Sequence, residues 1–256
     1  MHDIHNDFEI ENILEENRKR HEIINAPYNP VTGLGAVGER KKISIKDSPI
    51  GDMYLPVELI KENLFIRRLA KYGFKGYIIR FIKEVEYSEE ALNQLWIEFI
   101  KYRIIYDFEY WAYSFIFIKD KVSPKDIPFK LNRAQRRVLN KLEKLRKAGK
   151  PIKFILLKAR QWGGSTLVQI YMLWIMLVHR RNWNTVICGD VETQSRNVRA
   201  MITKALNKYP SYLLGETVKF TPFEGSSKNK VIQNTNCVVS IGSFQKPDTL
   251  RSGDIS

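Results

Sequence analysis

Cysteine, histidine and long apolar runs are scarce in this sequence, and each scarcity argues against a class of protein. The two cysteines, Cys188 and Cys237, both lie in apolar runs, as small buried residues of a reducing compartment do, rather than in a disulfide framework. The four histidines show no metal-ligand spacing except His2 and His5, which lie at a terminus where we expect fraying.

No membrane or export segment is predicted. The longest apolar stretch, residues 167–178, covers about 12 residues, whereas a bilayer requires roughly 20. The N-terminus is acidic and lacks the apolar core of a signal peptide. We therefore expect a soluble protein that is not secreted and has no membrane partner.

Acidic residues are also few, and their distribution is uneven. The 256 residues carry a formal net charge of +14. Residues 1–100 hold 14 Lys and Arg against 17 Asp and Glu, whereas residues 101–256 hold 28 against 11. Basicity concentrated on one part of a chain favours a polyanionic partner such as nucleic acid. The basic run 130–150 is compatible both with a DNA-phosphate groove and with a solvated helix face.

The apolar periodicity predicts an order of elements. Residues 8–24 form an amphipathic helix, and residues 25–56 a Pro- and Gly-rich arm with a possible strand at 41–45. Residues 57–118 are helical and aromatic, with Gly73 as a helix stop and Ser88 as an N-cap, and their aromatic side chains are expected in a core. Strands at 153–157 and 185–189 alternate with helices at 165–181 and 193–209, which indicates a parallel α/β sheet. A hairpin is expected around Asn234, Thr235 and Asn236.

The stretch "LLKARQWGGSTLVQI" (156–170) resembles a phosphate-binding loop without its usual lysine. The pattern G-x-x-x-x-G-K-[ST] aligns with Lys158–Ser165, but glycine replaces the lysine and lysine replaces the first glycine. Gly163 and Gly164 permit the backbone to face an anion, and the following helix start attracts negative charge. Lys158 can reach the same phosphates from the front of the loop, and Arg160 adds a second cation. The alternative is an ordinary strand–turn–helix that contains two glycines.

Gln135, in "FKLNRAQRRVL", lies upstream of this loop and has two interpretations. A glutamine amide can hydrogen-bond an adenine edge. Asn132 is also a good N-cap, and Gln135 lies three residues later, where a capping box places Glu or Gln. This segment alone favours the capping box.

Three other segments have weaker signals. "GLGAVG" (33–38) matches a dinucleotide-binding pattern, but its flanks predict a loop. "GDVETQSR" (189–196) follows a strand at the end where α/β sheets bind ligands, and there Asp190 is either catalytic or, as we favour, part of an acidic turn. Residues 246–255 gather Arg251, Gly253 and Asp254 without a spacing that fixes their role.

Four segments taken in order resemble the N-terminal ATPase region of the large terminase subunits of tailed bacteriophages. They are "IPFKLNRAQRRVL", "FILLKARQWGGST", "NTVICGDVETQSRNV" and "TLRSGDIS", and the resemblance covers roughly residues 107–256. It implies an α/β fold of the P-loop NTPase type, with a partial parallel sheet and helices on both faces, after a mostly helical N-terminal region. The chain then divides into a helix and arm (1–56), an aromatic helical region (57–120) and a partial P-loop ATPase domain (121–256).

The resemblance implies ATP and Mg²⁺ as cofactors. Lys158 matches a lysine displaced to the loop's beginning, and Arg160 matches an arginine finger in cis, which makes these two the expected catalytic residues. Gln135 matches an adenine-sensing glutamine, which reverses the preference for the capping box, and Ser165 matches the Mg²⁺-binding hydroxyl. The implied nucleotide-binding set is Gln135, Lys158, Ala159, Arg160, Gln161, Trp162, Gly163, Gly164, Ser165 and Thr166.

The implied partners are double-stranded DNA, a phage portal protein, the small terminase subunit and further copies of the chain in a ring, in the cytoplasm of a bacterial host. The family's acidic pair and nuclease carboxylates have no match here, so we expect a fragment or truncated reading frame that binds ATP with little hydrolysis. The alternatives are a helicase-like translocase fragment and a non-catalytic DNA-binding or docking module.

Overall fold

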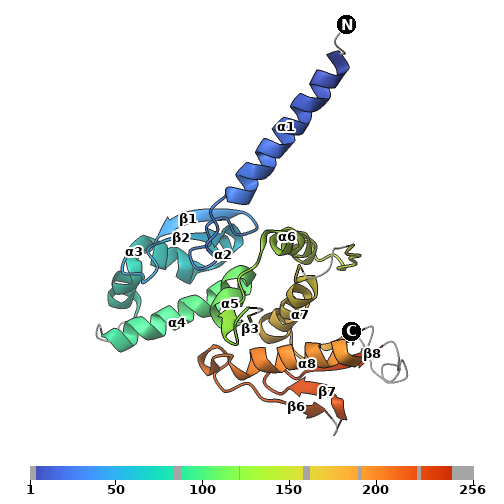
Figure 1. Ribbon diagram of the computed structural model, residues 1–256. Coiled ribbons are helices and arrows are strands. Elements are labelled where there is room, and N and C mark those ends of the chain that lie inside the picture. Colours follow the sequence, from blue (N-terminus) through green and yellow to red (C-terminus); the bar gives the residue numbers. More distant parts are fainter. Residues whose placement is uncertain are drawn as a thin grey trace.

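The computed structural model describes residues 4–82, 88–120, 122–157, 162–189, 192–223 and 226–243. It is a mixed α/β structure, about half helical, with small sheets (Figure 1). Its helices are α1 (Ile4–Asn25), α2 (Val57–Glu62), α3 (Leu64–Phe81), α4 (Glu89–Tyr106), α5 (Phe108–Phe115), α6 (Arg133–Lys147), α7 (Gly164–Trp174) and α8 (Glu192–Asn207). A π-helical turn, Ile175–His179, extends α7, and a short 3-10 turn covers Ser211–Leu213.

The strands form three sheets. β1 (Arg40–Ser44) pairs antiparallel with β2 (Asp52–Pro56), and β3 (Phe117–Lys119) pairs antiparallel with β4 (Asp126–Pro128). The third sheet has the order β5-β8-β7-β6, from β5 (Asn184–Gly189), β6 (Phe220–Phe223), β7 (Ser226–Ile232) and β8 (Cys237–Ser243). Only β5 and β8 are parallel there, and α8 packs over these two strands.

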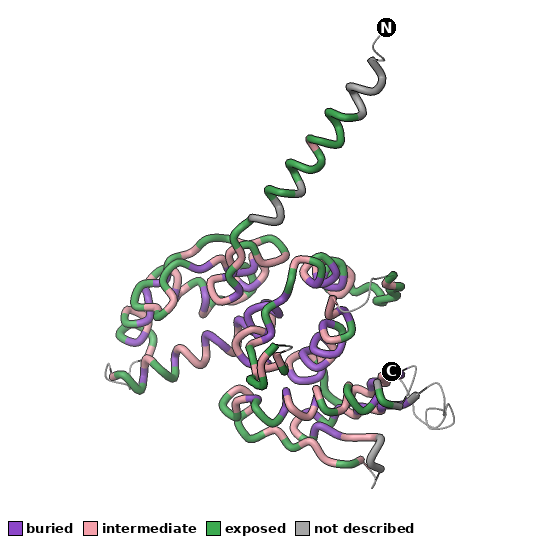
Figure 2. The backbone as a smooth tube through the Cα atoms, viewed as in Figure 1, coloured by how far each residue is buried: buried purple, intermediate pink, exposed green. Residues whose placement is uncertain are grey.

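Helix α1 projects away from the rest of the molecule, and nearly all of its described side chains are exposed (Figures 1 and 2). Ile10, Ile13 and Leu14 are among its exposed apolar residues. The predicted helix at 8–24 is therefore present, but its apolar residues do not pack on the core. No described helix is both long enough and apolar enough to cross a membrane.

A buried ionic cluster joins the N-terminal hairpin to α4 and α5. Asp107, 0% exposed, accepts two hydrogen bonds from Arg40 on β1, of 3.0 and 2.9 Å, and one of 3.1 Å from Arg103 on α4. It also caps α5 by accepting from the Tyr110 backbone N–H at 3.3 Å. The two guanidinium groups hold the pKa of Asp107 below its usual value against the opposing effect of burial. One carboxylate thus sets where α4 ends and where the hairpin lies.

Aromatic side chains from α5, α7 and the segment after α8 meet beside this cluster. Trp174 is fully buried and donates to the Ile104 carbonyl at 2.8 Å, and Phe108 lies edge-on to it at 5.3 Å. Trp111 donates to the Tyr209 hydroxyl at 2.9 Å. The predicted role of these aromatic residues in a core is confirmed, and the apolar core is continuous from Ile45 to Ile241.

Several local predictions are confirmed. Ser88 caps α4 by accepting from the Ala91 N–H at 3.1 Å, and the hairpin turn lies at residues 233–236. Gly73 interrupts α3 with a φ of 73° where the backbone meets Lys46. "GLGAVG" forms a loop, as predicted; a Cβ at Gly33 would lie 2.2 Å from the Tyr54 carbonyl oxygen.

Three predictions about strands are wrong. Residues 153–157 form no strand, and Ile155 and Leu157 are 99% and 100% exposed. Residues 117 and 118, expected in a helix, lie in β3 because Asp126–Pro128 supplies a partner. The predicted parallel sheet is a mixed one, with a single parallel pair. Strand formation depends on an available neighbour, which the apolar pattern of a segment does not specify.

The Asp107 cluster predicts a large loss of stability on substitution. Asp107→Asn leaves the buried Arg103 guanidinium without its anion and leaves Arg40 with only Glu109, 3.8 Å away, so we expect destabilisation of about 3 kcal/mol or more, measured by urea unfolding. Asp52→Asn is the matched control, because its partner Lys42 is exposed and the pair lies at the surface. Similar unfolding midpoints for the two variants would contradict the role assigned to Asp107.

Glu109 predicts a pH dependence of stability. Burial raises its pKa from 4.5 to about 7, although the charge of Arg40 opposes this shift. The folded protein therefore holds a proton that the unfolded chain releases, and the contribution of this group to stability falls as pH rises from about 4.5 to 7. Glu109→Gln should flatten the unfolding free energy over this window, and an unchanged slope would refute the assignment.

Candidate functional site

The first turn of α6 is closed by a capping box. The Asn132 side chain accepts from the Gln135 N–H at 2.9 Å, and the Gln135 Oε1 accepts from the Asn132 N–H at 2.8 Å. Gln135 is only 4% exposed. The capping-box interpretation of Gln135 is therefore confirmed.

The same two side chains also hold the glycine turn that precedes α7. Gln135 Nε2 donates to the Gly163 carbonyl at 2.9 Å, and Asn132 Nδ2 donates to the Trp162 carbonyl at 3.0 Å. A primary amide carries two N–H donors and an oxygen with two lone pairs, so Gln135 keeps one donor and one acceptor position for a further partner. Gln135 and the turn, 28 residues apart in sequence, are one structural unit.

Gly163 is required for this turn by both its backbone and its surroundings. Its φ is 82°, in the left-handed region that glycine tolerates best, and it is the N-cap residue of α7. A Cβ at this position would lie 2.6 Å from Gln135 Nε2. Helix α7 has no side-chain N-cap, so its first N–H groups, which lack intrahelical acceptors, are directed out of the helix start.

A cavity of about 770 Å³ opens beside the start of α7. It is bounded by the first turn of α7, by the carboxyl end of β5 and by α8; lining residues include Leu156, Ser165, Thr166, Gln169, Gly189 and Asn197. Helix starts and the carboxyl ends of strands are the places where α/β proteins bind anions. Gln135 is not among the lining residues and contacts the turn from the α6 side.

A second contact between α6 and α7 lies further along both helices. Glu143 accepts from the Tyr171 hydroxyl at 2.6 Å and makes two bonds of 2.8 Å with Arg146. Burial, and secondarily the charge of Arg146, lowers the pKa of nearby His179 to about 4, so this histidine is neutral near neutral pH. Together with the capping-box contacts, the hydrogen bond between Glu143 and Tyr171 fixes the start of α7 relative to α6.

The predicted site residues divide into three groups. Gln135, Trp162 and Gly163 lie together at the turn, and Gly164, Ser165 and Thr166 line the cavity. Lys158, Ala159, Arg160 and Gln161 lie outside the described residues, as do Asp190 and residues 246–255. The described members therefore lie at or beside the start of α7, and three of them line the cavity there.

Gln169 lines the cavity and was not among the predicted site residues. It is buried, and its Oε1 has no hydrogen-bond partner in the described part of the chain. A buried amide oxygen without a donor is costly, which favours a ligand or water at this position. The sequence feature that could have indicated Gln169 as a site residue is its polar side chain inside the apolar run 167–178.

Comparisons with known proteins do not assign this chain to a family. No protein-family model matches the chain, and a search of curated proteins finds no significant match.

The contact between Gln135 and Gly163 predicts a coupled effect on stability. Gly149→Ala, at a φ of 63° with open space around it, should cost about 1 kcal/mol from backbone strain alone. Gly163→Ala should cost about 1 kcal/mol more, because the new methyl group displaces Gln135 Nε2.

A double-mutant cycle tests this coupling by chemical denaturation. In a Gln135→Ala background the additional cost of Gly163→Ala should disappear, because no amide remains to be displaced. The same cost in both backgrounds would contradict the contact.

Proposed function

We propose that this chain is the ATP-binding portion of a DNA-packaging motor of the large terminase type. The observation that carries the proposal is the contact of Gln135 with Gly163, which joins the upstream glutamine to the glycine turn. An adenine-sensing role requires this proximity, whereas a helix cap alone does not. The order of the four sequence segments supports the same assignment.

In this proposal the start of α7 holds the phosphates. The N–H groups of Gly164, Ser165 and Thr166 and the partial positive charge of the helix start attract the anion. The Ser165 hydroxyl is a ligand for Mg²⁺, and Gln135 offers its remaining donor and acceptor to the base. ATP with Mg²⁺ supplies the transferable phosphoryl group.

The two loop cations complete the proposed site. Lys158 and Arg160 neutralise phosphate charge, and in the assembled motor Arg160 acts as the finger that stabilises charge in the transition state. A P-loop fold, a ring of subunits on a portal protein, a small terminase subunit and double-stranded DNA as cargo belong to the same proposal.

Two alternatives predict different nucleotide binding. A helicase-like translocase shares the loop and the glutamine, and it requires a second motor domain. A docking module requires no nucleotide, and the main aromatic residues of the helical half are buried rather than available to a partner. The structure therefore offers the docking module less support than the ATP-binding portion.

Nucleotide titration tests the proposal. The parent chain should bind a fluorescent ATP analogue in the presence of Mg²⁺, and Lys158→Ala should weaken binding about tenfold or more, a loss of about 1.4 kcal/mol. Lys153→Ala is the matched control, because Lys153 is exposed and precedes the loop. No binding by the parent, or equal affinities of the two variants, would overturn the proposed site.

A further inference from the structure

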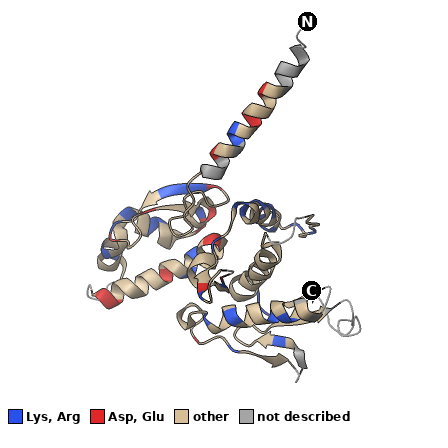
Figure 3. Ribbon diagram, viewed as in Figure 1, with Lys and Arg blue, Asp and Glu red and all other residues tan. Residues whose placement is uncertain are grey.

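Helix α8 and strand β7 enclose a second concave surface, which we call the α8–β7 groove. It has a volume of about 540 Å³, and its charged residues are Arg196, Arg199, Lys204, Lys208 and Lys230. Lys and Arg lie along α8 and on the neighbouring strand (Figure 3). The groove therefore has a single sign of charge, and it lies apart from the glycine turn.

The sequence of α8 places these cations in a line. Arg196, Arg199 and Lys204 on α8, with Lys208 one residue beyond its end, recur every three to five residues along the half of the helix turned away from the core. The stripe is roughly 18 Å long at 1.5 Å per residue. The side of the helix that is turned toward the core buries the apolar residues Ile202, Ala205 and Leu206. Packing against the core thus holds the basic side outward.

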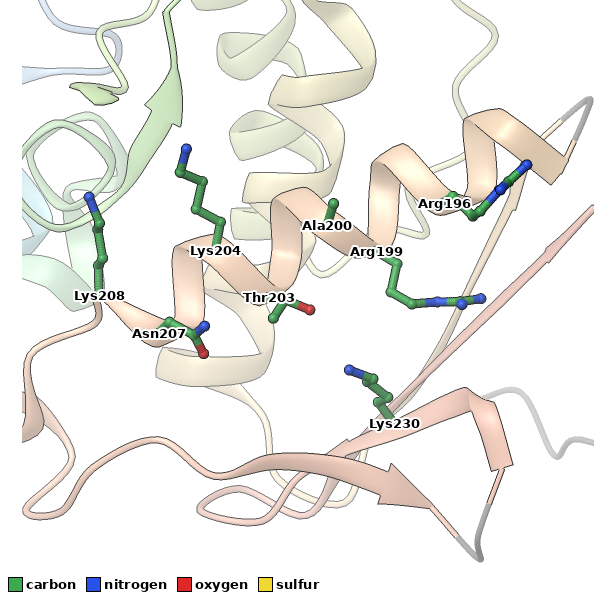
Figure 4. Close-up of a pocket in the computed structure, with 8 residues that line it drawn as sticks. All are labelled: Arg196, Arg199, Ala200, Thr203, Lys204, Asn207, Lys208 and Lys230. Carbon is green, nitrogen blue, oxygen red and sulfur yellow. The ribbon is translucent and has the colours of Figure 1, made fainter. Parts of the chain in front are cut away.

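Three of the five cations have no carboxylate partner in the part of the chain that the structure describes. Within the described residues no ion pair forms at Arg196, Arg199 or Lys230, and the buried Nε of Arg199 has no hydrogen-bond partner there. Figure 4 shows Lys230 extending from β7 toward α8, and Arg199 extending from α8 along the same groove; Lys230 Nζ also lies 4.9 Å from the centroid of the Phe220 ring. Two cations directed into one space, without an intervening anion, favour a negatively charged ligand.

The other two lysines share one carboxylate. Lys204 and Lys208 both contact Asp126 on β4, the latter at 2.6 Å, and these lysines point away from Lys230 (Figure 4). Their charges are only partly neutralised, because one carboxylate faces two ammonium groups. Asp126 is thus the anion that a phosphate ligand would have to compete with.

The lining favours a phosphate backbone over other polyanions. A protein partner requires an apolar centre in the interface, whereas the apolar lining of the groove consists of Ala200, the Thr203 methyl group and the methylene stems of charged side chains. Single-stranded nucleic acid is bound largely by stacking on aromatic rings, and none is among the groove's described lining residues. Thr203 and Asn207 supply neutral hydrogen-bonding groups of the kind that contact phosphate and sugar oxygens.

We propose that the α8–β7 groove binds the sugar-phosphate backbone of double-stranded DNA without reading its sequence. The choice of duplex DNA as the ligand rests on the proposed motor function. The assignment of the groove as a phosphate-binding surface rests on its geometry and charge instead. The stripe covers about five base pairs at 3.4 Å each. A contact of this kind holds the duplex while leaving it free to slide.

Fluorescence anisotropy with a short labelled DNA duplex, in the absence of nucleotide, tests the proposal. The triple variant Arg196→Ala, Arg199→Ala, Lys230→Ala should raise the Kd about tenfold or more at low salt. It should also reduce the slope of log K against log salt by about 2 to 3, near 0.9 for each lost phosphate contact. Asp126→Asn should tighten binding, because it removes the competing carboxylate.

A second triple variant, Lys61→Ala, Arg67→Ala, Arg80→Ala, is the matched control, since it removes the same charge from exposed positions on α2 and α3. It should leave the Kd and the salt slope close to the parent values. Equal effects of the two triple variants would overturn the groove assignment. Tighter binding of single-stranded DNA, or groove-dependent binding to phosphatidylserine vesicles in place of duplex DNA, would overturn the choice of ligand.

The result of the DNA-binding experiment can be interpreted independently of the nucleotide titration. If the parent binds duplex DNA through the groove but binds no ATP analogue, the groove assignment stands and the proposed nucleotide site fails. If the ATP analogue binds and the groove variant binds DNA like the control, the groove assignment fails alone. Thermal unfolding of both triple variants should match the parent, because the substituted side chains lie at the surface or line an open groove.

Discussion

The carboxylate of Asp107 is the constraint on which the arrangement of the helices depends. It receives hydrogen bonds from Arg40 and Arg103 in the interior and ends α4 where α5 begins. The resulting change of direction places Phe108 against Trp174 and Tyr171, so the position of α7 follows from it. A buried charge of this kind contributes little net stability, but it disfavours every arrangement that leaves it unpaired.

The position of the glycine turn depends on this arrangement of α4, α5 and α7. Helix α7 is held in its middle by the aromatic residues and by Glu143, and at its start by Asn132 and Gln135. Two short side chains thus serve both as the cap of one helix and as the support of the next helix's first turn. This double use explains how the capping box at Gln135 can also support the glycine turn.

Local signals in the sequence were sufficient for the helix caps and for β1, β5 and the β7–β8 hairpin, but they failed for residues 153–157 and for β3. Ser88 and Asn132 were recognisable as caps because a cap depends on residues only three positions away. Residues 153–157 have the composition of a strand, yet pairing requires a neighbour that composition does not specify. The cations of α8 follow a helical spacing, whereas their approach to Lys230 depends on how the sheet is ordered. For the candidate site, the turn and Gln135 were predicted from pattern, and Gln169 became visible only once the cavity was known.

The one parallel pair in the sheet determines the order in which the sheet can assemble. Ile232 and Cys237 meet across a short turn, while Asn184 must find Val238 after the whole of α8 and β6–β7 has intervened. The entropy of closing a loop grows with its length, so contacts between distant residues form late. We therefore expect the β6–β7–β8 meander to form before β5 pairs with β8, and this pairing brings the cavity wall at Gly189 into place.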